Sequence, residues 1–373
     1  MTSSNPPEFQ TGRSLLRAED GPLLRGEVDF TADLRDPVLE GAAFVAFVRS
    51  PVAAGRIRSL SLEGAEKAPG VVGAISGSDV DALAPFALPF GDHLAQPVLP
   101  TDEVRFSGQV LAAVVAETEA QAADAAELVL VDIEPREPVL DIDHALEVAT
   151  IEATRYSSSA SQPANRSGHR DPFEADVVIA MTQWSPRQLP APMEGRALAA
   201  APADGRLLVW SATQTPHAFK GNLAKLMDLP PESIRVVAPA VGGGFGGKVG
   251  RTTEEYLVPL LAHQLGRPVR WNETRSEYFA TATQGRGERI ELTLAGSSDG
   301  RLTALRANLV KDGGAFPLVG VVLPEAYTAK IANGCYHIEH VEFSSVAVLT
   351  NRPPTSAYRG AGRSPYIAAL ERA

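Results

Sequence analysis

The sequence has a single cysteine, Cys335, among its 373 residues. One cysteine excludes an internal disulfide framework. It also excludes an iron–sulfur cluster held by this chain alone, because such clusters typically take four thiolates. Any iron–sulfur centre that works with the protein must therefore lie on another subunit. Cys335 stands between Gly334 and Tyr336, and we expect it to be a small buried hydrophobic residue.

The chain also lacks an excess of basic charge and any long apolar run. Its formal net charge is −11, which disfavours nucleic acid as a partner. No segment approaches the roughly 20 apolar residues that span a bilayer, and residues 1–10 are polar, unlike a secretory signal. With 44% hydrophobic residues, the chain is predicted to be a cytoplasmic protein of about two domains, without a membrane or nucleic-acid partner.

Glycine, by contrast, is concentrated in two short segments. Val241–Lys248 reads Val-Gly-Gly-Gly-Phe-Gly-Gly-Lys, and Ala357–Arg363 reads Ala-Tyr-Arg-Gly-Ala-Gly-Arg. Glycine is used where φ must be positive or where a ligand touches the main chain. The exposed N–H groups of such loops bind anions. Two of these loops in one chain predict a phosphate-bearing cofactor.

The first glycine segment alone also fits a nicotinamide dinucleotide. Gly242–Gly247 follows the fingerprint G-x-G-x-x-G, a β-branched run at 234–237 precedes it, and a helix is predicted over 252–265. Glu273, after the next predicted strand, could hold a ribose hydroxyl. Against this interpretation, the fingerprint normally opens a domain, whereas here it follows most of the chain. A P-loop is disfavoured because Val249 stands where a serine or threonine must reach magnesium.

A wider set of motifs favours another interpretation, because its members occur in a fixed order. They are Ala46–Pro51 with Gly55–Arg58, Pro69–Gly73, Arg105–Gln109 with Ala112–Ala116, Met193–Glu194, Trp210–His217, Arg235–Pro239, Val241–Lys248 and Ala357–Arg363. In this order and spacing, the chain resembles the molybdopterin-binding large subunit of the xanthine dehydrogenase and aldehyde oxidase family. The resemblance runs from about Gly12 to the last residue.

The resemblance implies an α+β fold, in which an α/β hammerhead domain is followed by the first half of a mixed α/β molybdopterin-binding domain. We expect the hammerhead domain over residues 20–135, a connector over 136–172 and the cofactor-binding part over 173–373. Apolar, β-compatible runs predict strands of the hammerhead domain at 43–49 and 109–116.

The resemblance also implies roles for particular residues. Gln214 matches the glutamine that hydrogen-bonds an oxo ligand of the molybdenum, and Phe245 matches the aromatic residue near the open face of the metal. The Gly246 N–H matches a backbone donor to the same oxo group, and Arg359 matches the arginine of the second loop. From the residues alone, Gln214 could instead cap a helix, and Arg359 could instead pair with a carboxylate. Phe245 could be a core residue that pins the loop, which is compatible with its implied role. The other loop positions expected to bind the cofactor are Gly242, Gly243, Gly244, Gly247, Gly360 and Ala361.

In this family the pterin holds the molybdenum through dithiolene sulfurs, so no histidine or cysteine ligands are required of the protein. The resemblance implies molybdenum–molybdopterin as the cofactor, with the cytosine dinucleotide form as one option. It implies 2Fe–2S and FAD centres on partner subunits. The implied reaction oxidises an aldehyde or an N-heteroaromatic compound, with water as the oxygen donor and a glutamate as the general base.

That glutamate lies, in full-length relatives, in a segment well beyond the second glycine loop, and this chain ends first, at Ala373. We therefore expect no catalytic residue in this chain and a second molybdopterin-binding polypeptide that supplies the base. A truncated gene product or a fragment would look the same, and a non-catalytic remnant is the alternative outside enzymes. Glu194, Glu254 and Glu255 are not expected to act as the base, because structural carboxylates are commoner.

Two departures from the family pattern narrow the substrate. Purine-oxidising relatives carry a glutamate directly after the loop lysine, where this chain has Val249, so xanthine is disfavoured. Relatives that oxidise carbon monoxide bind copper through a cysteine in the second loop, and 357–363 contains none. The expected substrate is therefore an aldehyde or an N-heteroaromatic compound.

Overall fold

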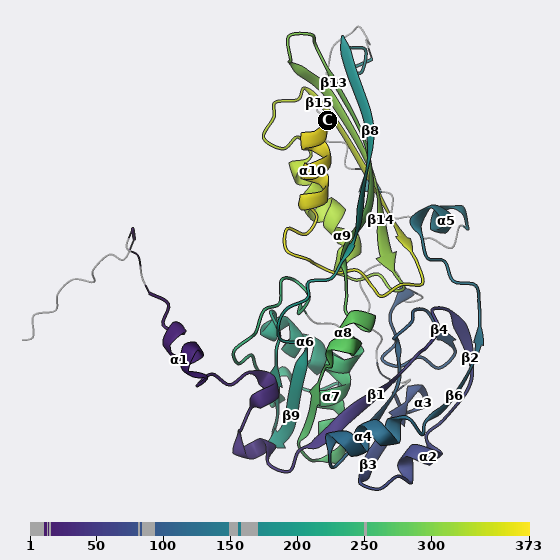
Figure 1. Cartoon of the computed structure of the whole chain (residues 1–373), viewed down its shortest axis with the longest axis vertical. Helices are drawn as coiled ribbons and strands as arrows, with labels where there is room; N and C mark the ends of the chain where they lie inside the picture. The colour runs from purple at the N-terminus through teal and green to yellow at the C-terminus, as the bar shows by residue number, and fades with distance from the viewer. Residues whose placement is uncertain are drawn as a thin grey trace, which may run out of the picture.

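The protein is built on two large β-sheets that follow one another along its long axis (Figure 1). The computed structural model describes residues 11–12, 14, 16–80, 83, 94–148, 156–157, 171–249 and 252–373. Within these residues the strands form sheets of seven, five and three strands. Helices lie against them in a mixed α/β arrangement, so the fold class predicted from the sequence is confirmed.

The seven-stranded sheet contains strands from both sides of the expected domain boundary, that is, from the hammerhead part and from the cofactor-binding part. β1 runs parallel to β12, with Ala43 opposite Val269 and Phe44 opposite Arg270. The hammerhead strands therefore continue directly into strands of the cofactor-binding part. In spatial order the strands are β11 (Ile234–Val237), β10 (Arg206–Ser211), β9 (Ala197–Ala203), β12 (Val269–Asn272), β1 (Ala43–Arg49), β5 (Val110–Ala116) and β3 (Val71–Ser76).

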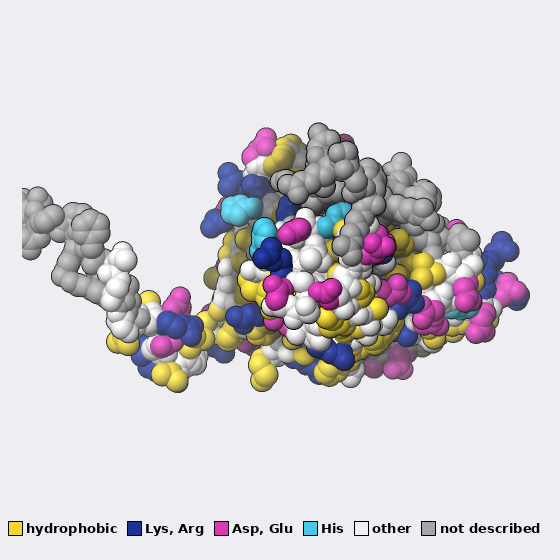
Figure 2. All heavy atoms as spheres, turned by 90° about the horizontal axis from the view of Figure 1, so that it is seen from above, with side chains coloured by type: hydrophobic (Ala, Val, Ile, Leu, Met, Phe, Trp, Pro, Cys, Tyr) yellow, Lys and Arg dark blue, Asp and Glu magenta, His cyan; other side chains and the backbone are white. Residues whose placement is uncertain are grey.

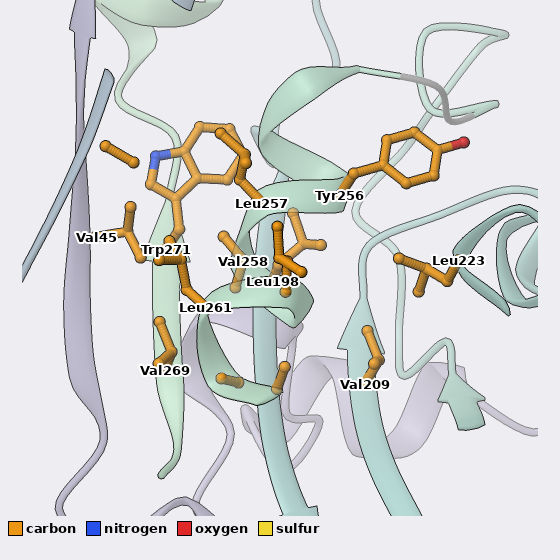
Figure 3. Close-up of a cluster of buried hydrophobic side chains, with 14 of the residues drawn as sticks. Val45, Leu198, Val209, Leu223, Tyr256, Leu257, Val258, Leu261, Val269 and Trp271 are labelled. Carbon is orange, nitrogen blue, oxygen red and sulfur yellow. The ribbon is translucent and has the colours of Figure 1, made fainter. Parts of the chain in front are cut away.

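α7 (Thr253–Leu265) and α6 (Pro216–Leu226) cover this sheet and form the main core with it. A capping box between Thr252 and Glu255 begins α7, and the left-handed Gly266 ends it at a φ of 64°. Figure 3 shows apolar side chains of α7 among those of the strands and of α6. The labelled residues are Val45, Leu198, Val209, Leu223, Tyr256, Leu257, Val258, Leu261, Val269 and Trp271.

The five-stranded sheet carries the second core. Its long strands are antiparallel from β8 to β14, and β15 joins parallel to β14. α10 (Ser364–Arg372) packs on this sheet through Tyr366, Ala369 and Leu370, all buried (Figure 1). The spatial order is β7 (Tyr156–Ser157), β15 (His340–Leu349), β14 (Leu302–Gly314), β13 (Gly285–Gly296) and β8 (Val177–Gln188).

The smallest sheet and one described helix of the expected connector lie beside the two large sheets (Figure 1). α5 (Ile142–Glu147) falls inside the connector and packs through Ile142 and Ala145 against Val348 of β15. Residues 149–155 and 158–170 of the connector lie outside the described residues. The small sheet has the order β4 (Glu103–Val104), β2 (Gly55–Ser61) and β6 (Leu130–Pro135).

The remaining helices are short, and α1 stands on an N-terminal segment that projects from the body (Figure 1). They are α1 (Asp20–Arg25), α2 (Glu63–Glu66), α3 (Gly77–Val80), α4 (Glu119–Ala126), α8 (Arg275–Thr281) and α9 (Val319–Leu323). Single turns are η1 (Thr31–Asp33), η2 (Pro37–Leu39), η4 (Pro231–Ser233) and η6 (Ala329–Ile331), and η5 (Pro324–Thr328) is a π-helix.

The exposure of Cys335 and the distribution of surface charge can be compared with what the sequence predicted. Cys335 is exposed, so its prediction as a buried residue is wrong; it follows the left-handed Gly334 in a turn that faces solvent. Figure 2 looks onto the end of the five-stranded sheet, where acidic and basic side chains are interspersed. Across the described ranges, no helix combines the length and the apolar character needed to cross a membrane.

Candidate functional site

The first glycine segment forms a tight loop between β11 and α7. Gly243, Phe245 and Gly246 have φ values of 94°, 52° and 96°, a left-handed backbone that glycine adopts freely and phenylalanine rarely. A Cβ on Gly246 would lie 2.7 Å from the carbonyl oxygen of Ala357, so this position leaves no room for a side chain. Phe245 is 44% exposed despite its size, so it is not a core residue.

Gln214 connects this loop to the segment after β10. Its backbone N–H donates to the carbonyl of Lys248 at 2.7 Å, and its side-chain oxygen accepts the N–H groups of Gly246 at 2.9 Å and Lys248 at 3.2 Å. These bonds go to the loop and not to α6, so Gln214 is not a helix cap. The Gly246 N–H, predicted to serve the cofactor, is bonded to Gln214 in this structure.

A buried ion pair holds both ends of the loop. Glu194 Oε2 accepts the backbone N–H of Gly242 at 2.7 Å and the ammonium of Lys248, also at 2.7 Å. Burial lowers the pKa of Lys248, whereas its contact with Glu194 opposes that shift. Lys248 is thus occupied inside the protein and not available for a phosphate, and Glu194 acts as a loop support.

The second glycine segment lies directly against the first. The N–H of Arg359 donates to the carbonyl of Phe245 at 2.8 Å, which joins the two loops through their main chains. Gly360, at a φ of 80°, turns the chain into α10, and its carbonyl accepts the N–H groups of Arg363 at 2.9 Å and Ser364 at 3.2 Å. Two loops far apart in the sequence therefore form one surface.

A cavity of about 520 Å³ opens beside this surface, next to α9. Six of the predicted site residues line it: Gln214, Phe245, Gly246, Arg359, Gly360 and Ala361. The other four predicted residues are glycines of the first loop that do not line the cavity. A Cβ on each of them would come within 3.2 Å of a neighbouring side chain: Gly242 against Glu194, Gly243 against Phe245, Gly244 against Gln214 and Gly247 against Pro190. Their role is to allow close packing of the loop.

The cavity also has walls that the sequence did not indicate. Val319, Leu323 and Tyr327 contribute an apolar side from α9 and η5. Nothing in their segment, which lacks loop glycines and charge patterning, distinguishes it from an ordinary core helix. Arg363 lies at the end of the second motif and holds its guanidinium 4.8 Å from the ring centre of Tyr327; its place in the motif could have identified it.

The carboxylates that resembled possible bases are structural. Glu254 pairs with Arg49 at 2.9 Å and with Arg196 at 3.1 Å. Burial alone would raise the pKa of Glu254, but Arg196 and Arg49 outweigh burial and bring this pKa down to about 2. Glu255 caps α7 through Thr252, and its burial raises its pKa. Neither group lines the 520 Å³ cavity.

The nicotinamide alternative conflicts with the position of Glu273. Its carboxylate is fully buried and accepts the Nε of Arg196 at 3.0 Å and the backbone N–H of Arg196 at 2.8 Å. It therefore cannot reach a ribose hydroxyl. α7 begins only at Thr253, whereas the fingerprint requires the glycine turn to open the helix. The glycine loop belongs to the joined pair of loops and not to a βαβ turn.

The lining of the cavity fits an anionic cofactor that brings its own metal ligands. The glycine loops expose main chain, and Arg359 and Arg363 supply positive charge. In the part of the chain that the structure describes, no group of three or more His, Cys, Asp or Glu could hold a metal ion. A metal bound by the sulfurs of an organic cofactor needs no such group.

Comparisons with known proteins identify the family of the chain. A family model described as the molybdopterin cofactor-binding domain matches residues 168–373. A second, for the a/b hammerhead domain of aldehyde oxidase and xanthine dehydrogenase, matches residues 25–137. The nicotine 6-hydroxylase large subunit of Paenarthrobacter nicotinovorans is 30% identical over 370 residues, covering 94% of this chain and 44% of that protein.

One solved structure and one further relative complete the comparison. The crystal structure of quinoline 2-oxidoreductase from Pseudomonas putida 86 matches with a TM-score of 0.84 and 35% identity, over 94% of this chain and 46% of that chain. The nicotinate dehydrogenase large molybdopterin subunit of Eubacterium barkeri is 26% identical, over 94% of this chain and 81% of that protein. The chain thus spans less than half of the length of the nicotine 6-hydroxylase large subunit and of the quinoline 2-oxidoreductase chain. It belongs to the xanthine dehydrogenase and aldehyde oxidase family and corresponds to the N-terminal portion of the molybdopterin-binding large subunit.

Proposed function

We propose that this chain is the molybdenum-cofactor-binding part of a molybdenum hydroxylase that oxidises an N-heteroaromatic compound or an aldehyde with water as the oxygen donor. The observation that carries the proposal is the hydrogen bond from the Arg359 N–H to the carbonyl of Phe245. This bond places both glycine loops on one wall of the 520 Å³ cavity.

Particular side chains then acquire particular tasks. When bound, the molybdenum cofactor supplies the oxidation of a carbon centre. Gln214, its amide oxygen held by the loop, offers its nitrogen as a donor to the cofactor. The exposed guanidinium of Arg359 offsets the negative charge of the group. Phe245 presents an aromatic ring at the cavity, where a planar substrate can stack.

An N-heteroaromatic substrate is favoured over an aldehyde. The relatives named for nicotine, quinoline and nicotinate act on nitrogen-containing rings. The cavity wall formed by Val319, Leu323 and Tyr327 is apolar and partly aromatic, as a flat ring requires. Val249 in place of the purine-binding glutamate disfavours xanthine, and the second loop lacks the cysteine that carbon monoxide oxidation requires.

We further propose that the general base comes from a second molybdopterin-binding polypeptide. The carboxylates Glu194, Glu254 and Glu255 are all engaged in supporting contacts. A relative named as a large molybdopterin subunit, from Eubacterium barkeri, is covered to 81% of its length by this chain, which supports a molybdopterin-binding subunit of about this size. Subunits with 2Fe–2S and FAD would accept the electrons, and the cytosine dinucleotide form and a cytoplasmic location stay predictions.

The test is to follow the oxygen atom. The tagged chain, purified from its own host with the polypeptides that accompany it, would be incubated with quinoline and nicotinate in water enriched in a heavy oxygen isotope. We expect a hydroxylated ring that carries the heavy isotope, detected by mass spectrometry. Because each hydroxylation with water releases two electrons, an artificial electron acceptor would be included in the assay. Incorporation from molecular oxygen would contradict the proposal.

A further inference from the structure

Arg286, near the start of β13, has a backbone conformation that is unusual for its residue type. Its φ is 64°, and the following Gly287 has a φ of 76°. Residues other than glycine rarely adopt such angles, and they keep them only where the surroundings enforce them. Strained residues of this kind cluster at functional sites. The question is what an arginine provides here that a glycine would not.

The backbone carbonyl of Arg286 is bound by a buried lysine. Lys311 on β14 donates from its ammonium to the carbonyl of Arg286 and pairs with Glu288 at 2.9 Å. The side chains of Lys311 and Glu288 are 1% and 4% exposed. A buried charge with two fixed partners has little freedom to move. The left-handed conformation of Arg286 is therefore set by a rigid part of the five-stranded sheet.

The side chain of Arg286 reaches from this rigid base to the second glycine loop. Its Nη2 donates to the carbonyl of Arg359 at 2.8 Å, and its Nη1 donates to the carbonyl of Gly360 at 3.4 Å. The guanidinium also lies 4.9 Å from the ring centre of Tyr358. One planar group thus contacts three consecutive residues of the loop, a pattern that a fork of fixed donors can make and a lysine cannot.

These contacts determine which way the loop presents its other groups. The carbonyl of Arg359 accepts from Arg286, and the N–H of Arg359 donates to Phe245 at 2.8 Å, so the peptide groups on both sides of Arg359 are held by hydrogen bonds. A neighbouring contact adds support, since a Cβ on Gly285 would lie 2.3 Å from the Cβ of Tyr358. The wall of the cavity therefore depends on a residue that does not itself line it.

We propose that Arg286 is a positioning residue that orients the second glycine loop, and with it Arg359, toward the molybdenum cofactor. The inference rests on the proposed function for the identity of the cofactor. The order of the second glycine loop does not depend on the proposed function, because the contacts of Arg286 within the chain set it.

The substitution Arg286→Gly distinguishes an effect on the order of the second glycine loop from an effect on the stability of the fold. Glycine adopts the same φ without strain, so Arg286→Gly is expected to keep or raise the melting temperature. Loss of the guanidinium removes the bonds to the carbonyls of Arg359 and Gly360, so the loop should open more often. We expect hydrogen exchange of the Arg359 amide, which is bonded to Phe245, to speed up by about ten-fold or more, the size of effect of one lost charged hydrogen bond. Molybdenum retention on dialysis should fall in parallel, and Arg286→Lys should restore only part of it.

Asp204→Gly is the matched control, because Asp204 also has a positive φ, 50°, and lies in the exposed turn between β9 and β10. It should leave the exchange of the Arg359 amide unchanged. All variants would be purified with their accompanying polypeptides. If Arg286→Gly lowers the melting temperature yet leaves the exchange of the Arg359 amide unchanged, the inference is overturned. If the wild type carries no molybdenum but the exchange responds as expected, the proposed function fails and the inference stands.

Discussion

Gln214 shows most clearly how single residues shape the site. Its amide oxygen binds two N–H groups of the first loop, and the loop glycines leave just enough room for it. The sequence motifs located Gln214, Phe245 and Arg359, since each stands inside a recognisable pattern. The pair of Glu194 and Lys248 could not be predicted, because its two members are far apart in sequence and either could have been a surface charge.

Gly244→Ala should damage the cofactor site more than the fold. A Cβ at this position would lie 2.4 Å from the side-chain oxygen of Gln214 and must displace that amide. We expect a large loss of bound molybdenum with a loss of stability of about 1–3 kcal/mol, typical of overpacking. Elemental analysis and thermal unfolding would measure the two effects. Gly221→Ala is the control, since apart from its chain neighbours and the backbone of its own helix nothing lies within 4 Å of its Cβ position. Equal metal loss in both variants would contradict the account.

Acid should destabilise the protein partly through Glu254. The folded pKa of this carboxyl is about 2, below its ordinary value of 4.5, so its contribution is fully present above pH 4.5 and is lost as the pH falls toward 2. Glu254→Gln should therefore cost roughly 3 kcal/mol at neutral pH, with a smaller difference from wild type at low pH. Denaturant unfolding at several pH values checks this.

Glu255 has a raised pKa, so its titration changes the stability in the opposite direction to that of Glu254. Because Glu255 is present in both the wild type and Glu254→Gln, its contribution largely cancels in the stability difference between the two proteins. A stability difference between wild type and Glu254→Gln that stays constant between neutral pH and pH 3 or so would show that Glu254 has an ordinary pKa.

At the scale of elements, local patterns predicted more than long-range pairing. The apolar run at 43–49 became β1 with the same bounds, and the helix expected over 252–265 became α7 from Thr253. The parallel pairing of β1 with β12 could not be predicted, because it joins segments more than two hundred residues apart and nothing local specifies such a partner. Cys335 was misjudged for a similar reason, since burial depends on which elements pack over a turn.

The shared sheet predicts that the hammerhead strands unfold together with the neighbouring strands of the cofactor-binding part. Leu198 on β9 is 1% exposed in the main core (Figure 3), and Leu198→Ala should cost about 3 kcal/mol. Hydrogen exchange should then speed up in β5 as well, although β5 belongs to the expected hammerhead domain. Exchange mass spectrometry would locate the effect.

Leu309→Ala is the matched control, because Leu309 is equally buried in the other core, on β14. It should loosen the five-stranded sheet and affect β5 much less. Unchanged exchange in β5 after Leu198→Ala would mean that the hammerhead strands unfold independently, in spite of the shared sheet.

On the scale of the whole molecule, the two sheets and the loops between them place backbone from distant parts of the chain around one cavity. β10 and β11 lead to Gln214 and the first loop, whereas β15 leads to the second loop and α10. The family explains this design, because a large organic cofactor needs contacts from several segments. The chain covers less than half of the large subunits of nicotine 6-hydroxylase and quinoline 2-oxidoreductase, so the proposed reaction involves polypeptide beyond these residues.

The molybdenum content of the chain, purified from its own host with its accompanying polypeptides, tests the central claim most directly. We predict molybdenum in stoichiometric amount, together with iron, flavin and a second molybdopterin-binding polypeptide identified by mass spectrometry. A chain that stays free of molybdenum while those polypeptides are present would contradict the account and would indicate a non-catalytic member of the family.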